Sequence, residues 1–276
     1  PSWKMLPALV AGNTIIWKPS EETPAMSAAF VQVFIDAGLP AGVLNLVLGA
    51  GDVGGALVTH PDVRVVSFTG STTTGLNVYQ QAAGQGKKVS LEMGGKNAII
   101  VMDDANLELA IQAITWSAFG TTGQRCTATS RLIVHKDIHN TLVEALVEKG
   151  KSLRVGDGLN PDVEVGPLVN MKALSKVESY MGVAESEGVR TVLGGARASV
   201  PLGYFFQPTL LDRVSPEMRV AREEIFGPVL SIIEVGSLDE AVEVNNSVIY
   251  GLSSSIFTVR LNSSCIFLLF SISNPY

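Results

Sequence analysis

The 276-residue sequence predicts an α/β fold in which parallel sheets are covered by helices. Three observations predict it. Short apolar runs alternate with segments of helical periodicity, the connections between successive runs are long enough for a helix, and 46% of the residues are apolar. Helix-length crossovers favour parallel strand pairing, and this apolar content is ample for a buried core. Ligands of such sheets bind beyond the carboxyl ends of the strands, so the turns from strand to helix are the places to search for a site.

Residues 1–93 hold the first strands and helices of this alternation. An apolar run at 14–17 predicts a strand, and apolar residues at helical spacing between 26 and 37 predict a helix that ends at Gly38-Leu39-Pro40. By the same criteria, we expect strands at 43–48, 63–68 and 89–91, and helices after the glycine-rich segment 49–55 and over 71–83. The pair Gly94-Gly95 is the expected boundary to a second lobe.

The second lobe continues the alternation with longer elements. We expect strands at 98–102 and 131–134, helices at 107–119 and 138–153, and a further helix from about Met171, with Asn106 capping the first of these helices. The last segment, 261–276, differs from the rest of the chain. It contains no charged residue, whereas a charged content of 17% predicts about three. Two interpretations stay open for it, a buried terminal strand and a segment foreign to the fold.

Charge and composition exclude several classes of function. The chain has 20 lysines and arginines against 26 aspartates and glutamates, a net charge of −6, which argues against a nucleic-acid or anionic-membrane partner. The apolar run at 265–270 is far shorter than the roughly 20 residues of a membrane span. Two cysteines favour a reducing, cytoplasmic location, and three histidines favour no metal site. We expect His135 and His139 to lie on the surface.

Two residues are candidates for covalent and acid–base chemistry. Cys126 stands in the glycine-containing segment 123–128 after an apolar helix, and such a turn exposes a thiol as a nucleophile requires. Glu92 stands at a strand end between apolar residues and the glycine pair, where partial burial would raise its pKa toward that of a general base. A solvated glutamate at a strand end is the other interpretation.

Two strand-to-helix turns are candidates for a nucleotide. In the first turn, Gly70 permits close backbone approach, and Ser71 with the following helix N-terminus suits a phosphate, although a simple serine cap explains the same pattern. In the second, Lys18 and Glu21 have the spacing to hold the hydroxyls of a ribose, or to form a solvated charged pair. A ribose-binding Glu21 would repel a 2′-phosphate and so favour NAD over NADP.

Five segments in order resemble blocks of the aldehyde dehydrogenase superfamily. Residues 91–98 resemble its glutamate signature and residues 119–128 its cysteine signature. Further blocks stand at residues 18–24, 68–71 and 223–228, and the resemblance covers residue 1 to about residue 258. It implies an aldehyde-dehydrogenase-like α/β fold with a Rossmann-like cofactor lobe and a catalytic lobe. In this division, residues 1–93 are the C-terminal part of the NAD-binding domain, 94–260 an incomplete catalytic domain and 261–276 a tail outside the family pattern.

The resemblance also implies an activity and a role for individual residues. The activity is oxidation of an aldehyde to a carboxylic acid with NAD, in which Cys126 attacks the aldehyde, Glu92 activates the water that hydrolyses the thioester, and Lys4 lies near the nucleophile. Lys18 and Glu21 would hold the adenosine ribose and Ser71 the pyrophosphate. The other implied cofactor-binding residues are Gly70, Gly75, Gly94, Glu224 and Phe226. Full-length members of the family form homo-oligomers.

Other interpretations stay open beside this one. The family's oxyanion-hole asparagine would precede Pro1, and the sequence resembles roughly the middle half of a member, truncated at both ends. An inactive gene fragment and a non-catalytic NAD-binding relative are therefore alternatives. Glu92 argues against an acylating enzyme that uses coenzyme A. Residues 2–7 and 126–131 faintly resemble α-ketoglutaric semialdehyde dehydrogenases, in which Arg125 or Arg131 could meet a distal carboxylate.

Overall fold

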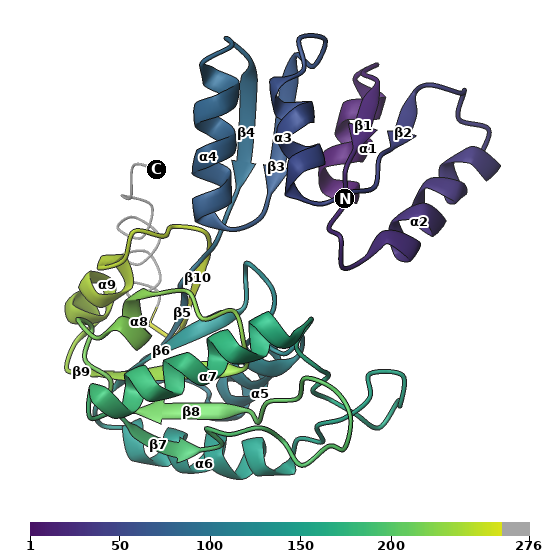
Figure 1. The fold of residues 1–276 in the computed structure, drawn as a ribbon. Helices are drawn as coiled ribbons and strands as arrows, with labels where there is room; N and C mark the ends of the chain where they lie inside the picture. Colours follow the sequence, from purple (N-terminus) through teal and green to yellow (C-terminus); the bar gives the residue numbers. More distant parts are fainter. Residues whose placement is uncertain (261–276) are drawn as a thin grey trace. The chain divides into compact units, whose positions relative to one another are not determined.

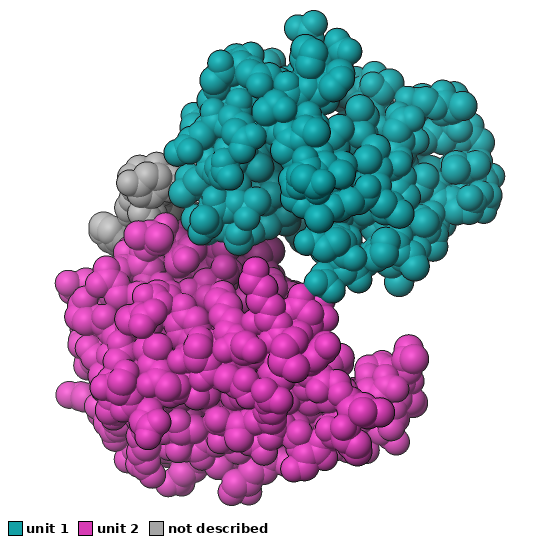
Figure 2. Space-filling model, viewed as in Figure 1, with its two compact units in different colours: residues 1–93 teal, residues 94–276 magenta. Residues whose placement is uncertain are grey.

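The computed structural model describes residues 1–260, so the segment 261–276 lies outside the described residues. The chain divides into two compact units, Pro1–Met93 and Gly94–Tyr276, which Figure 2 shows in two colours. The division falls directly before the glycine pair at which the sequence analysis expects a boundary. The strands and helices expected between residues 14 and 186 occur with their ends shifted by at most two residues.

Unit 1 consists of two separate parallel strand pairs with their helices (Figure 1). Strand β1 pairs with β2, and β3 pairs with β4. The elements are α1 (Ser2–Val10), β1 (Ile15–Trp17), α2 (Pro24–Asp36), β2 (Leu44–Leu46), α3 (Gly51–Thr59), β3 (Val65–Thr69), α4 (Thr72–Ala83) and β4 (Lys88–Glu92). The sequence analysis missed α1. It predicted the crossovers through α2 and α4 that make both pairs parallel.

Unit 2 is built on one six-stranded sheet, with strand order β10-β5-β6-β9-β8-β7. Its strands are β5 (Asn97–Val101), β6 (Thr129–His135), β7 (Arg190–Leu193), β8 (Thr209–Asp212), β9 (Val229–Val235) and β10 (Ser254–Phe257). Its helices are α5 (Leu107–Phe119), α6 (His139–Ser152), α7 (Met171–Ser186), α8 (Arg219–Arg222) and α9 (Leu238–Asn246). The two-lobed α/β fold with parallel sheets is confirmed, with one exception at β7.

The exception is an antiparallel edge strand. Strand β7 pairs antiparallel with β8, whereas all other pairings in this sheet are parallel. No helix separates the two strands. The chain turns back after β7 through Gly194 and Gly195, whose φ angles of 68° and 90° place both in the left-handed region that favours glycine. A connection without a crossover helix joins antiparallel strands, and the sequence analysis proposed no elements for this part.

The core of unit 2 lies on both faces of the sheet. All five residues of β5 are buried, and they alternate between two clusters: Ala98 and Ile100 pack on one face, Ile99 and Val101 on the other. Helices α7, α8 and α9 contribute to the first cluster, and α5 and α6 to the second. Continuous apolar runs are typical of parallel strands that are covered on both sides. The chain segments next to the ends of β5 and β6 are therefore supported by a rigid core.

Two local predictions have opposite outcomes. The cap is confirmed, because the Asn106 carboxamide oxygen accepts a hydrogen bond from the Leu109 N–H at 3.1 Å. The surface position of the histidines is wrong. His135 and His139 are 9% and 1% exposed. His139 Nε2 lies 2.9 Å from Asp212 Oδ1, and His135 Nε2 lies 3.1 Å from the Gly236 carbonyl oxygen. These buried partners come from β8 and from the end of β9, far from either histidine in sequence.

Candidate active site

The segment that carries the candidate nucleophile, residues 120–128, is called the nucleophile loop here. It follows α5 and precedes β6, and Cys126 is a free, exposed cysteine on it. The loop turns through Thr122 and Gly123, with φ angles of 55° and 64°. A side chain at Gly123 would also overlap the Gly227 carbonyl, so only glycine fits there. The expected exposure of the thiol is therefore found, on a tightly turned backbone.

Asn97 at the start of β5 fixes the position of the nucleophile loop. Its side-chain amide donates hydrogen bonds to the carbonyl oxygens of Cys126 at 2.7 Å and Ala128 at 3.0 Å. Its carboxamide oxygen accepts a third from the Ser253 N–H at 3.1 Å. A Cβ atom on Gly95 would lie 2.7 Å from the Cys126 carbonyl oxygen, so the glycine is required for this close packing. The glycine pair and Asn97 therefore hold the backbone of Cys126 directly.

Glu224 packs on the same glycine pair. Its Oε1 accepts a hydrogen bond from the Gly95 N–H at 3.0 Å, and a Cβ atom on Gly94 would collide with its carboxylate. Phe226 lies two residues further, 41% exposed, with a φ of 63° that a bulky residue adopts only under constraint. The structure thus brings Gly94, Glu224 and the Cys126 loop together at the start of β5.

Lys96 is a buried charge beside this group that the sequence analysis did not single out. It is 1% exposed, and its Nζ has no hydrogen-bond partner within the described residues. Burial, followed by repulsion from Arg131, lowers the pKa of Lys96 to about 7, and attraction from Glu224 only partly opposes this. With a pKa of about 7, the Lys96 amine is close to half protonated at neutral pH.

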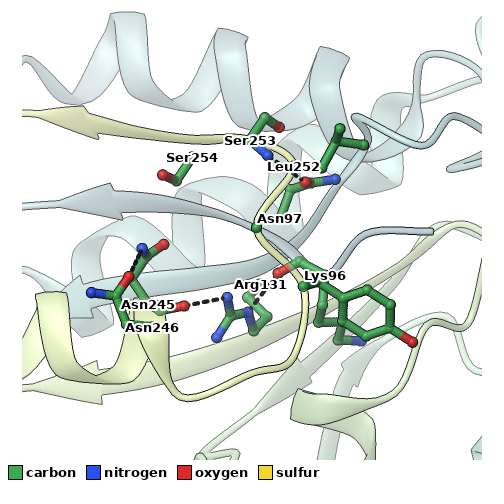
Figure 3. A pocket seen from close by; sticks show the side chains of 10 residues that line it. Lys96, Asn97, Arg131, Asn245, Asn246, Leu252, Ser253 and Ser254 are labelled. Carbon is green, nitrogen blue, oxygen red and sulfur yellow. Dashed lines mark hydrogen bonds between the residues drawn. The ribbon is translucent and has the colours of Figure 1, made fainter. Parts of the chain in front are cut away.

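Arg131 is anchored to three backbone carbonyl groups. It is 2% exposed, and its guanidinium donates to the carbonyl oxygen of Val244 at 2.8 Å. It also donates to the carbonyl oxygens of Lys96 and Asn245, each at 2.9 Å (Figure 3). Burial lowers its pKa to about 10. The proposed contact of Arg131 with a distal carboxylate is therefore wrong, because its donors tie β6 to β5 and to the end of α9. A cavity of about 560 Å³ beside it is lined mainly by polar side chains.

The Lys18 turn lies at the carboxyl ends of β1 and β2. Lys18 Nζ donates to the carbonyl oxygens of Pro19 at 2.6 Å and Gly49 at 2.9 Å, and it lies 3.9 Å from Glu21 Oε2. The lysine side chain is 18% exposed and the glutamate side chain 62%. Lys18 is thus anchored to backbone, while the Glu21 carboxylate faces solvent close by. The structure brings this predicted pair together at one sheet edge.

The Ser71 turn lies at the carboxyl ends of β3 and β4. The Gly70 N–H donates to the Glu92 carbonyl oxygen at 3.1 Å, which places this turn beside the end of β4. Ser71 caps α4: its hydroxyl oxygen accepts from the Thr74 N–H at 3.3 Å and lies 2.9 Å from Thr74 Oγ1. The next hydroxyl, Thr72 Oγ1, is buried and has no hydrogen-bond partner among residues 1–260. A helix N-terminus with an unsatisfied hydroxyl is thus present at the turn predicted for a phosphate.

Three other predicted residues of unit 1 have different surroundings. Of the two interpretations of Glu92, the structure shows the solvated glutamate and not the partly buried one, because β4 alternates and Glu92 lies on its exposed face. Gly75 is needed for packing: a Cβ atom there would lie 2.6 Å from Met93 Sδ. Lys4 on α1 donates to Ser67 Oγ on β3 at 3.0 Å. Unit 1 therefore holds three separate polar groups: the Lys18 turn, the Ser71 turn, and the hydrogen bond between Lys4 and Ser67.

Comparison with known proteins gives one family match over nearly the whole chain. The sequence model of the family described as "Aldehyde dehydrogenase family" matches residues 1–267, which runs past the end of the expected resemblance near residue 258 and into the segment 261–276. This chain belongs to the aldehyde dehydrogenase family.

Relatives within the aldehyde dehydrogenase family support this membership over nearly the whole chain. An α-ketoglutaric semialdehyde dehydrogenase of Bacillus subtilis is 46% identical over 265 residues, which is 95% of this chain and 54% of that protein. A crystal structure of a putative aldehyde dehydrogenase from Burkholderia cenocepacia has a TM-score of 0.95 at 42% identity, covering 98% of this chain and 56% of that one. A betaine aldehyde dehydrogenase from Staphylococcus aureus, in complex with NAD⁺, has a TM-score of 0.93 at 36% identity, covering 97% and 54%. The chain spans about half the length of the relatives it matches.

Within residues 1–260, no group of three or more histidine, cysteine or acidic side chains is placed to hold a metal ion. In the same described part of the chain, no helix is long and apolar enough to cross a membrane.

Proposed function

We propose that the protein oxidises an aldehyde to a carboxylic acid with NAD as the hydride acceptor. The observation that supports this best is the exposed Cys126 on a loop that Asn97 and the glycine pair hold by its backbone, in a chain of the aldehyde dehydrogenase family. The loop leads directly into the buried strand β6, so the core supports the loop while the Cys126 thiol itself stays exposed, as a reactive thiol requires. Relatives named for semialdehydes and for betaine aldehyde match this chain at 46% and 43% identity, so they leave the substrate open.

The proposed reaction assigns one covalent step and one proton transfer to this chain. The Cys126 sulfur attacks the carbonyl carbon and forms a thiohemiacetal. Loss of a hydride from that carbon leaves a thioester. Water then attacks the thioester, Glu92 takes the proton of that water, and the acid leaves while the thiolate is restored. The exposed side chain of Glu92 is compatible with a base that must meet a water molecule.

The residues of unit 1 fit the proposed cofactor. Its two polar turns lie at carboxyl ends of parallel strands, where nucleotides bind in such sheets. The buried, unpartnered Thr72 hydroxyl at the start of α4 leaves a donor for a phosphate oxygen beside Gly70 and Ser71. Lys18 and Glu21 supply donor and acceptor groups for ribose hydroxyls. NAD, when bound, supplies the hydride acceptor.

The proposal extends to the roles of the two units. Unit 1 would hold most of the cofactor and supply Glu92 and Lys4. Unit 2 would supply Cys126, with Gly94, Glu224 and Phe226 toward the nicotinamide end. The exposed Glu21 carboxylate supports NAD over NADP, since it would meet a 2′-phosphate with like charge. A cytoplasmic location is part of the proposal, and so is a homo-oligomeric state for the full-length protein, not for residues 1–276 alone.

A pair of cysteine variants tests the proposal. In the protein as its gene encodes it, Cys126→Ser should abolish aldehyde-dependent NADH formation, because a serine hydroxyl without an adjacent base is a poor nucleophile. Cys265→Ser is the matched control, since it removes the other cysteine of residues 1–276 and should leave the rate unchanged. NADH absorbance at 340 nm with a panel of aldehydes measures both. Activity that survives in Cys126→Ser would overturn the assignment of the nucleophile.

A further inference from the structure

The side-chain amide of Asn97 contacts three backbone groups from two separate segments of unit 2. The two N–H groups of Nδ2 reach the carbonyl oxygens of Cys126 at 2.7 Å and Ala128 at 3.0 Å. Oδ1 accepts a hydrogen bond from the Ser253 N–H at 3.1 Å, and Asn97 is 5% exposed. An amide turned by 180° would set its oxygen against two carbonyl oxygens and its nitrogen against an N–H group. Only one orientation therefore satisfies all three partners.

The nucleophile loop has two halves that different parts of unit 2 hold. In the first half, the side chains of Thr122 and Gln124 donate to backbone carbonyl groups of the segment 166–167, at 3.0 and 3.1 Å. The second half, residues 125–128, forms a turn that is closed by a backbone hydrogen bond of 3.0 Å. Asn97 joins this turn to the start of β5. Its amide thus links the turn that carries the thiol to the buried sheet.

Other side chains at position 97 would lose part of this set of hydrogen bonds. A carboxylate has nearly the same shape but no N–H group, so its oxygens would face the two carbonyl oxygens of the loop. An apolar side chain would leave both carbonyl groups without this donor, and an unpaired buried polar group is costly. A serine hydroxyl keeps one donor. The backbone around the start of β5 therefore requires an amide for full pairing.

We propose that Asn97 is a positioning residue of the reaction, which holds the Cys126 sulfur where it attacks the aldehyde carbonyl. The role rests on the proposed function, in which Cys126 is the nucleophile. Asn97 acts through the backbone of Cys126 and takes no part in the bond-forming steps. A displacement of about 1 Å in a reacting group lowers a rate by up to about 100-fold, so control of the loop backbone is control of the rate.

An almost isosteric substitution tests this role in the protein as its gene encodes it. Asn97→Asp removes both donors and keeps an acceptor for the Ser253 N–H. In a single turnover with saturating NAD and aldehyde, its rate constant for NADH formation should fall about 10- to 100-fold. The dissociation constant of NAD, measured by titration calorimetry, should change less than about twofold, because the lost bonds lie on the nucleophile loop. Asn97→Ser should give a rate constant between those of Asn97→Asp and the unmodified protein.

Asn45→Asp is the matched control. Asn45 on β2 also donates from Nδ2 to two carbonyl oxygens, those of Ile15 at 3.2 Å and Gly42 at 2.9 Å, but it is exposed. Its rate constant should stay within about twofold of the unmodified protein. An unchanged rate constant in Asn97→Asp, with or without a lower amplitude, would show that Asn97 supports folding alone and would overturn the role. An equal loss in Asn45→Asp would overturn it as well.

A second measurement needs no turnover, so it stands even if no aldehyde yields NADH and the proposed function fails. Hydrogen exchange followed by mass spectrometry reports on the backbone of residues 125–128. Asn97→Asp should speed exchange there by about tenfold or more, because the turn loses its bonds to the sheet, and Asn45→Asp should not. Unchanged exchange in this turn, or an equal increase throughout α5 and α6, would overturn the positioning role of Asn97.

Discussion

The two units place their functional groups on different kinds of support. In unit 2, the nucleophile loop stands between α5 and β6, and both apolar clusters of the described chain belong to this unit, with α5 and β6 contributing to them. In unit 1, the strands β3 and β4 alternate between exposed and half-buried side chains. The buried apolar residues of unit 1 are Met5, Val31, Val58 and Ala82. The hydrogen bonds that hold the thiol loop therefore start from a fully buried strand, whereas those that hold the polar turns belong to strands that are half exposed.

The largest expected difference lies between the thiol of unit 2 and the carboxylate of unit 1. Cys126→Ser should lower the rate of hydride transfer by at least about 10³, because the bond to the substrate no longer forms. Glu92→Gln should keep one rapid turnover and stall at the thioester, because only hydrolysis needs its base. Stopped-flow measurement should show a burst of NADH in Glu92→Gln alone. A Glu92→Gln protein without a burst would mean that Glu92 acts before hydride transfer.

A matched pair of isoleucines tests the difference in support. Ile100 in β5 is fully buried, and Ile35 in α2 is 55% exposed. Ile100→Ala should cost about 2–5 kcal/mol in the free energy of unfolding, because it leaves a cavity in the sheet core. Ile35→Ala should change it by less than about 0.5 kcal/mol. Urea unfolding measures both. Similar losses would show that the two units are supported equally.

The pH dependence of stability should separate a buried lysine of unit 2 from an exposed one of unit 1. The folded pKa of Lys96, about 7, lies below its unfolded value of 10.5. Below pH 7 the lysine is charged in both states and its burial penalty is complete. Between pH 7 and 10.5 the unfolded chain binds more protons than the folded one. The loss of unfolding free energy that burial of Lys96 causes therefore becomes smaller as the pH rises.

Lys96→Met should therefore stabilise the protein at pH 6.5, by an amount on the order of a few kcal/mol, and progressively less toward pH 10. Lys88→Met on β4, at an exposed position, is the control and should show no such trend. Thermal unfolding across this pH range checks both variants. A gain from Lys96→Met that does not change with pH would contradict titration of Lys96 in the folded state.

The smallest expected effect concerns cofactor choice in unit 1. Glu21→Ser should raise the efficiency with NADP relative to NAD by roughly 3- to 10-fold, because removal of the carboxylate relieves repulsion of the 2′-phosphate. Glu22→Ser, at the neighbouring position, is the control. Steady-state kcat/KM with each cofactor gives the ratio. An unchanged ratio in Glu21→Ser would exclude this side chain as a discriminator.

The parts of the fold that the sequence predicts are those with local signals. Alternating apolar runs predicted β1 to β6, and Asn106 marked the start of α5, because periodicity and caps act over a few residues. The burial of His139 depends on Asp212, which lies 73 positions further along the chain. No local pattern contains that partner. The antiparallel β7 likewise depends on how a long connection returns to the sheet.

The candidate site shows the same limit. Cys126, Glu224 and Lys18 were found because they stand in motifs. Asn97 was missed, although it makes two of the hydrogen bonds that hold the nucleophile loop, since an asparagine at a strand start has no distinctive pattern. Its only signal was its place directly after Gly94-Gly95-Lys96. Arg131 was misassigned because the carbonyl groups of Val244 and Asn245 approach it from a distant helix.

The three carbonyl groups around Arg131 make its hold on the sheet independent of ionic strength. Added salt screens pairs of opposite charges near solvent, such as Arg260 with Asp103, whose side chains are 56% and 30% exposed. Within residues 1–260, Arg131 forms no ion pair with a carboxylate; its partners in the hydrogen bonds described above are carbonyl oxygens, and it is buried from ions. Concentrated salt should therefore loosen the chain around Arg260 and leave the junction of β5, β6 and α9 intact.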